Sequence, residues 1–136
     1  MNHASWTALI GLCAWTLFLL VLMEGLRARL VVGKEVAANA FKPDNANLSP
    51  FMQRLARAHA NCIESLPVFG ALLLAALVAG RPDVTDPLAL WLLGARVVQS
   101  TVHLASLSVV AVNVRFMAFA VQVAIAVWWT IALLKI

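Results

Sequence analysis

The sequence of 136 residues is 63% hydrophobic and only 12% charged, whereas soluble globular domains carry about 25% charged and about 45–50% apolar residues. This composition excludes an ordinary soluble domain, and the length predicts one all-α membrane domain, residues 1–136, with about four spans of about 20 residues each. The net charge of +4 does not indicate a nucleic-acid partner, because four of the ten basic residues gather in one loop beside an apolar segment.

The first predicted span covers residues 6–24. Trp6 is placed to anchor one membrane interface, and Arg27 and Arg29 mark the other. The apolar run is preceded by no Lys or Arg, so we expect it to be retained as a span rather than removed as a signal peptide. Residues 30–50 then have the composition of a polar loop.

Three further spans are predicted at residues 51–79, 88–112 and 116–134, with a polar turn at 80–87 and a short turn at 113–115. The first loop is rich in Lys and Arg, whereas the second contains one Arg. The positive-inside rule therefore places the first and third loops in the cytoplasm. We expect a four-transmembrane-helix bundle, multi-pass in the inner (cytoplasmic) membrane of a bacterium.

Cysteine and histidine positions indicate neither a disulfide framework nor a metal site. Cys13 and Cys62 both lie in apolar helical stretches, where we expect them to be small buried hydrophobic side chains. Around His59 there is no second histidine or carboxylate at ligand spacing, so no metal site is predicted.

Two groups of polar residues interrupt the second and third spans, where ionisable side chains are costly and need partners. Helical spacing places each group on one face of its helix: Arg54, Arg57, Asn61 and Glu64 in the second span, and Arg96, Gln99, Ser100 and His103 in the third. Glu64 and Arg96 fall at similar depths near the middle of the membrane, so the geometry allows an ion pair between them. Such a pair can be purely structural, but the excess of arginine over glutamate favours a ligand with carboxylates and amides.

Residues 51–67, FMQRLARAHANCIESLP, resemble the second-helix motif of the MAPEG superfamily, the membrane-associated proteins of eicosanoid and glutathione metabolism. That motif reads approximately R-A-x-x-N-x-x-E-x-x-P, and such polar spacing inside a membrane span is rare. The chain length, the four spans, the polar first loop and the segment Ala95-Arg96-Val97 also agree with the family, so the resemblance covers nearly the whole chain.

The resemblance implies a homotrimer of four-helix subunits, with glutathione bound between adjacent subunits and open to the cytoplasm. In the family, the arginine, asparagine and glutamate of the motif bind glutathione, and the matching residues are Arg57, Asn61 and Glu64. An arginine at the end of the first span contributes to binding, for which Arg27 is the best match. An arginine at the start of the fourth span stabilises the glutathione thiolate, and Arg115 fits that place.

The implied chemistry is physically reasonable, because a thiol with a pKa of about 8.5 becomes a strong nucleophile when a nearby guanidinium favours its thiolate. Two tyrosines of the third span commonly contact glutathione in the family, but this sequence contains no tyrosine, and Gln99 and His103 occupy their places. The candidate catalytic residue is therefore Arg115, and the candidate glutathione-binding residues are Arg27, Arg54, Arg57, Asn61, Glu64, Arg96, Gln99 and His103.

The predicted function is a glutathione-dependent membrane transferase or peroxidase that acts on lipophilic electrophiles delivered through the bilayer. A non-catalytic lipid-binding or scaffold protein with the same fold is an alternative that the sequence leaves open. A small proton or drug transporter is a third interpretation, but it predicts a lone acidic site, and three arginines accompany Glu64. Binding of glutathione to the purified protein separates the first interpretation from the other two.

Overall fold

The computed structural model describes residues 3–136, which form four α-helices: α1 (Ala4–Val32), α2 (Pro50–Val78), α3 (Pro82–Ala105) and α4 (Val109–Leu133). The helices contain 24 to 29 residues, and at the helical rise they measure about 36–44 Å, which exceeds a hydrocarbon core of about 30 Å. All four are apolar enough to cross a membrane. The predicted all-helical architecture with four spans is confirmed, and the chain is an integral multi-pass membrane protein.

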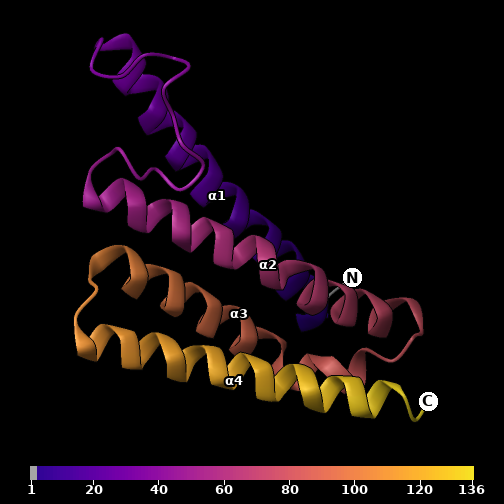
Figure 1. Ribbon diagram of the computed structural model, residues 1–136. Helices are drawn as coiled ribbons and strands as arrows, with labels where there is room; N and C mark the ends of the chain where they lie inside the picture. The colour runs from indigo at the N-terminus through magenta and orange to yellow at the C-terminus, as the bar shows by residue number, and fades with distance from the viewer. Residues whose placement is uncertain (1–2) are drawn as a thin grey trace.

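The helices alternate in direction, so the α1–α2 loop and the α3–α4 turn lie at one end of the molecule and the α2–α3 turn and both termini at the other (Figure 1). Helix α1 packs against α2 and α3, whereas α4 packs mainly against α3 and over a shorter stretch against α2. Within residues 3–136, no Cα atom of α1 lies within 8 Å of a Cα atom of α4. The polar faces of α2 and α3 are thereby brought together in the middle of the bundle.

The boundary between the third and fourth helices differs from the prediction. Helix α3 ends at Ala105 rather than near residue 112, and the predicted turn at 113–115 is part of α4. The physical reason is the capping of α4 by Ser108, whose hydroxyl accepts a hydrogen bond from the backbone nitrogen of Ala111 at 3.2 Å. As a result, Arg115 lies in the second turn of α4 and not in a loop.

Two apolar clusters hold the helices together. The cluster nearer the termini contains Leu12, Phe69, Leu73, Leu92 and Trp129, and the cluster nearer the long loop contains Leu19, Met23, Met52, Leu55 and Cys62. Most other large apolar side chains point outward, as expected for helices that face lipid or another protein chain. The interior is not wholly apolar: Ser5 of α1 and Thr85 of α3 are buried and hydrogen-bonded to each other near the termini. Further along, α3 and α4 bury Arg96, Gln99, Ser100, His103 and Gln122.

Candidate functional site

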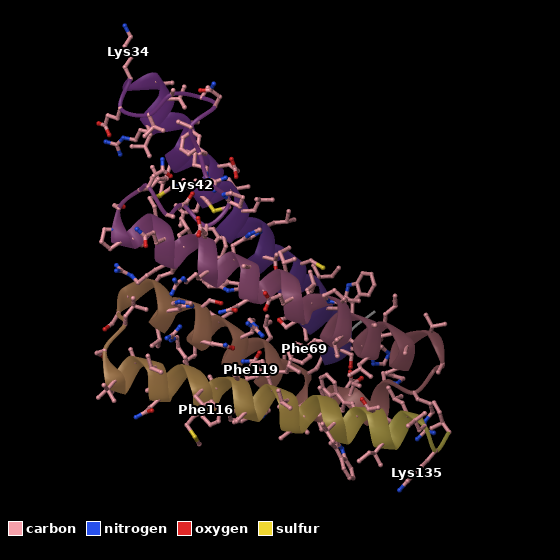
Figure 2. All side chains as sticks on the ribbon, in the orientation of Figure 1. Lys34, Lys42, Phe69, Phe116, Phe119 and Lys135 are labelled. Atoms are coloured by element: carbon pink, nitrogen blue, oxygen red, sulfur yellow. The ribbon has the colours of Figure 1, made fainter. Side chains whose placement is uncertain are left out.

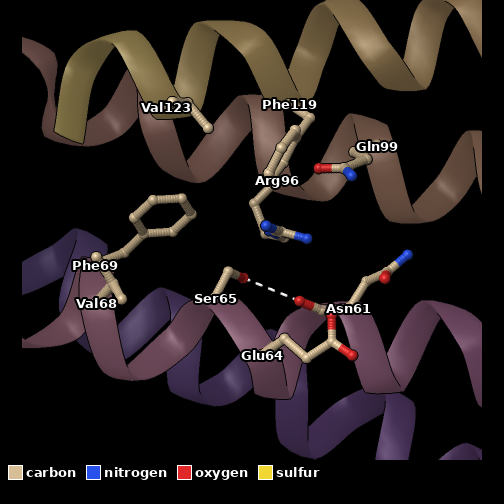
Figure 3. Close-up of a pocket in the computed structure, with 9 residues that line it drawn as sticks. All are labelled: Asn61, Glu64, Ser65, Val68, Phe69, Arg96, Gln99, Phe119 and Val123. Atoms are coloured by element: carbon tan, nitrogen blue, oxygen red, sulfur yellow. Dashed lines mark hydrogen bonds between the residues drawn. The ribbon is translucent and has the colours of Figure 1, made fainter. Parts of the chain in front are cut away.

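A pocket of about 390 Å³ opens between α2, α3 and α4 near the middle of the bundle (Figure 3). Its lining residues form a polar group and an apolar group, and most of the lining surface is apolar. The polar half contains Asn61, Glu64, Ser65, Arg96 and Gln99, and the apolar half contains Val68, Phe69, Phe119 and Val123. The pocket can therefore hold a polar group next to an apolar one, at a depth that a lipid-soluble molecule can reach.

Arg96 is the dominant charge of this pocket. Its side chain is only 2% exposed, and within the described part of the chain all three of its guanidinium nitrogens are buried without a hydrogen-bond partner. The guanidinium carbon lies 5.8 Å from the centre of the Phe69 ring, which gives some compensation through a cation–π contact. An unpaired buried cation is energetically costly, so this position strongly favours an anionic partner.

The Glu64–Arg96 ion pair that the sequence allowed is not formed. The ion pairs among residues 3–136 are His3–Asp86, Arg27–Glu24 and Arg81–Asp83. Glu64 is exposed, and it lines the pocket from α2 while Arg96 lines it from α3 (Figure 3). The two charges face a common space without neutralising each other, as expected of groups that bind a ligand carrying both signs of charge.

The second candidate feature is a basic cluster, defined as Arg54, Arg57, His103 and Arg115. His103 of α3 is buried, and the three arginines are the charged groups that act on it electrostatically. Arg54 is held by a hydrogen bond from its Nε to the backbone oxygen of Leu104 at 2.9 Å. The buried Nε of Arg115 and Nε2 of His103 have no partner among the described residues. The cluster is thus a concentration of positive charge with open donors.

The basic cluster follows the pocket along α2 and α3. Arg57 lies two helical turns before Glu64 on α2, and His103 lies two turns after Arg96 on α3, which places both pairs about 10 Å apart along their helices. Both cluster residues lie toward the end that carries the α3–α4 turn. Eight of the nine candidate residues belong to these two groups. The pocket is lined by Asn61, Glu64, Arg96 and Gln99, and the basic cluster contains Arg54, Arg57, His103 and Arg115. Arg27 falls elsewhere.

Arg27 is engaged by its own loop. Its Nε and Nη2 donate to Oδ1 of Asn45 at 3.0 and 2.6 Å, and its Nη1 pairs with Glu24 at 3.0 Å. Asn45, which is fully buried, in turn donates from Nδ2 to the backbone oxygen of Met52 at 2.7 Å. Arg27 and Asn45 therefore link the loop to the end of α1 and to the start of α2. Arg29, by contrast, is exposed and carries no such contacts with the loop.

Sequence reasoning did not select Ser65, Phe119, Val123 or Gln122, which line or support the pocket. Gln122 carried a usable signal, because an amide inside an otherwise apolar span needs a partner. Phe119 and Val123 carried none, since apolar residues are ordinary in such a helix. Their place at the pocket follows from how α4 is rotated against α2 and α3, which periodicity alone does not fix.

Comparison with known proteins adds a whole-chain match. Residues 5–135 match the model of the MAPEG family. No curated protein and no solved structure gives a significant match.

Proposed function

Since the chain belongs to the MAPEG family, we propose that it is a glutathione-dependent transferase or peroxidase that activates the glutathione thiolate against lipophilic electrophiles. The observation that carries this proposal is the buried, unpaired guanidinium of Arg96, which faces the same pocket as Glu64. The pocket and the basic cluster together carry more positive than negative charge, which suits a small peptide with more anionic than cationic groups. Glutathione, with two carboxylates, one ammonium and two amides, has this distribution.

In the proposed complex, the arginines bind the two carboxylates and Glu64 accepts a hydrogen bond from the ammonium group. Guanidinium groups bind carboxylates through two parallel hydrogen bonds, which fixes orientation as well as affinity. The separation of about 10 Å between the pocket and the basic cluster suits an extended tripeptide, whose residues span about 3.3–3.6 Å each. Asn61 lines the pocket about one helical turn from Arg57 and can hydrogen-bond a peptide group in the middle of the ligand.

For conjugation, a guanidinium beside the sulfur lowers the pKa of the thiol, and the proton leaves to water. The thiolate then attacks an electrophilic carbon, so a C–S bond forms while the leaving group departs with the displaced electron pair. For peroxide reduction, the thiolate attacks the peroxide and the O–O bond breaks, so that an alcohol and a sulfenic acid form. A second glutathione then displaces water from that sulfenic acid, and an S–S bond forms to give glutathione disulfide. In both reactions the apolar half of the pocket, with Phe69 and Phe119, holds the lipophilic substrate.

We further propose that the protein works as a homotrimer, as the family resemblance implies. Glu64 is the central residue of α2 and is exposed in the single chain, and Arg57 on the same stripe is exposed as well. A charged side chain at this depth does not face lipid without a large penalty. A neighbouring copy that covers this stripe removes the penalty and encloses a glutathione bound there.

The proposal is tested by titrating glutathione into the purified protein in detergent and measuring the heat of binding. We expect Arg57→Ala to weaken binding by about 1.5–3 kcal/mol, the range for a hydrogen bond to a charged group. Arg81→Ala is the matched control, because Arg81 lies at the opposite end of the bundle, paired with Asp83, and its loss should leave the affinity unchanged. Absence of binding to the wild-type protein would refute the proposed function.

The apolar half of the pocket also supports the alternative of a non-catalytic lipid-binding protein. Val68, Phe69, Phe119 and Val123 offer a wall that an acyl chain can contact. If this alternative holds, the purified protein retains a lipid that native mass spectrometry detects, and glutathione neither binds nor displaces it.

We propose that the α1–α2 loop and the α3–α4 turn face the cytoplasm of a bacterium. Lys34 and Lys42 mark the end of the molecule that carries the loop (Figure 2), where positive charge favours the cytoplasmic side. With both native cysteines replaced by alanine, Ala38→Cys in the loop should be protected from an impermeant thiol reagent added to intact cells. Ala79→Cys, which is exposed near the α2–α3 turn, should be labelled. The reverse pattern would invert the proposed topology.

A further inference from the structure

Two glutamine side chains meet in the interior of the bundle, directly behind the pocket. Gln122 of α4 is fully buried, and its Nε2 donates to Oε1 of Gln99 at 2.9 Å and to the backbone oxygen of Ala118 at 2.9 Å. Gln99 is also buried and lines the pocket beside Arg96 (Figure 3). Gln122 does not itself line the pocket, and its Oε1 is buried without a hydrogen-bond partner among residues 3–136.

The donor and acceptor roles in this pair are fixed by the backbone. A backbone carbonyl only accepts hydrogen bonds, so the NH2 group of Gln122, and not its oxygen, must face Ala118. The same NH2 group reaches Gln99, which therefore must present its oxygen to Gln122. The NH2 group of Gln99 is then the part of the amide that remains for the pocket. A flipped Gln99 would set two NH2 groups against each other.

With this orientation, both polar side chains that α3 contributes to the pocket present hydrogen-bond donors to it. Arg96 offers only N–H donors, and Gln99 is held so that it offers N–H donors as well. A carboxylate, which only accepts hydrogen bonds, satisfies both side chains at once. A ligand carboxamide in the same place would turn its own NH2 group toward the N–H donors of Arg96 and Gln99. That NH2 group would be buried without an acceptor, which is strongly disfavoured.

We propose that Gln122 is a positioning residue that locks Gln99 as a hydrogen-bond donor, and that this lock makes the pocket select a carboxylate over a carboxamide. This inference rests on the proposed function, because it assumes that Arg96 and Gln99 bind one carboxylate of glutathione. The lock itself is a property of the α3–α4 contact. When Gln122 is removed, the Gln99 amide is free to rotate and to present its oxygen to a ligand donor.

The test compares glutathione with its two monoamides, each of which converts one carboxylate to a carboxamide, by calorimetric titration. Wild type should strongly reject one of the two monoamides. Gln122→Met, which removes the amide at similar length, should reduce that discrimination about tenfold, the equivalent of one hydrogen bond. In a Gln99→Met background, adding Gln122→Met should leave the discrimination between the ligands unchanged, because Gln122 acts through Gln99. Equal discrimination in wild type and Gln122→Met, or independent additive effects, would overturn the proposal.

A merely structural role for the pair predicts a different result, since Gln122→Met would then lower the melting temperature and leave the ratio of the two affinities unchanged. Failure of the proposed function is recognised separately, by wild type binding neither glutathione nor its monoamides. The lock is then tested on the ligand-free protein with wild type, the two single variants and the double variant. Non-additive shifts in melting temperature support it, and additive shifts overturn it.

Discussion

Arg96→Met is expected to make the ligand-free protein more stable and at the same time to remove most of its affinity for glutathione. The guanidinium is buried and has no hydrogen-bond partner among residues 3–136, so the folded chain bears its desolvation cost without compensation by an anion. Methionine fills a similar volume without a charge, and replacing buried charges by apolar side chains stabilises proteins by up to about 1–4 kcal/mol. The contact with the Phe69 ring offsets only part of this gain.

Binding should change in the opposite direction. If a glutathione carboxylate neutralises Arg96, the Arg96→Met variant leaves that carboxylate buried without a cation. Loss of one partner of a buried, hydrogen-bonded charge pair weakens binding by about 2–5 kcal/mol. The measurements are the melting temperature in detergent without ligand and the calorimetric dissociation constant of glutathione. Arg96→Lys is the informative comparison, because it keeps the charge and loses the planar fork. A lower melting temperature together with unchanged affinity in Arg96→Met would show that Arg96 supports the fold and does not bind the ligand.

Periodicity was sufficient to predict most of the arrangement along each helix. Residues spaced by three and four share one helical face, and Asn61 and Glu64 indeed line one pocket with Arg96 and Gln99. Mean composition likewise predicted the number of spans, because a bilayer core demands about 20 apolar residues in each. These features depend on the local chain alone, which is why sequence reasoning could reach them.

Features that depend on the packing of distant segments could not be predicted in this way. Arg27 lies at the expected place at the end of α1, yet the direction of its side chain is set by Asn45, a loop residue with φ of 56° whose position no pattern indicates. Glu64 and Arg96 have compatible depths, but depth does not specify the rotation of one helix against another, and the two do not pair. The break before α4 depends on the Ser108 cap, which the apolar residues that follow it obscure.

Arg115→Ala should lower the turnover of the glutathione reaction about 10²–10³-fold, the effect of removing one electrostatic stabiliser of a developing or resting anion, with a smaller effect on glutathione binding. Arg115 comes from the second turn of α4, and its Nε is buried without a partner in the part of the chain that the structure describes. It faces the same region as His103, where three arginines accumulate. In the proposed mechanism this charge holds the bound thiol as a thiolate.

The decisive measurement for Arg115 is the ultraviolet absorbance of the thiolate as a function of pH, with glutathione saturating. Loss of the guanidinium should raise the pKa of the bound thiol, and each unit corresponds to about 1.4 kcal/mol. An interfacial arginine that only anchors α4 would tolerate lysine, whereas a planar site for the sulfur would not, so Arg115→Lys should fall close to Arg115→Ala in turnover. An unchanged titration in Arg115→Ala would assign the thiolate to another cation. Arg96 is then the strongest candidate for stabilising the thiolate, because its guanidinium is buried and unpaired beside the apolar half of the pocket.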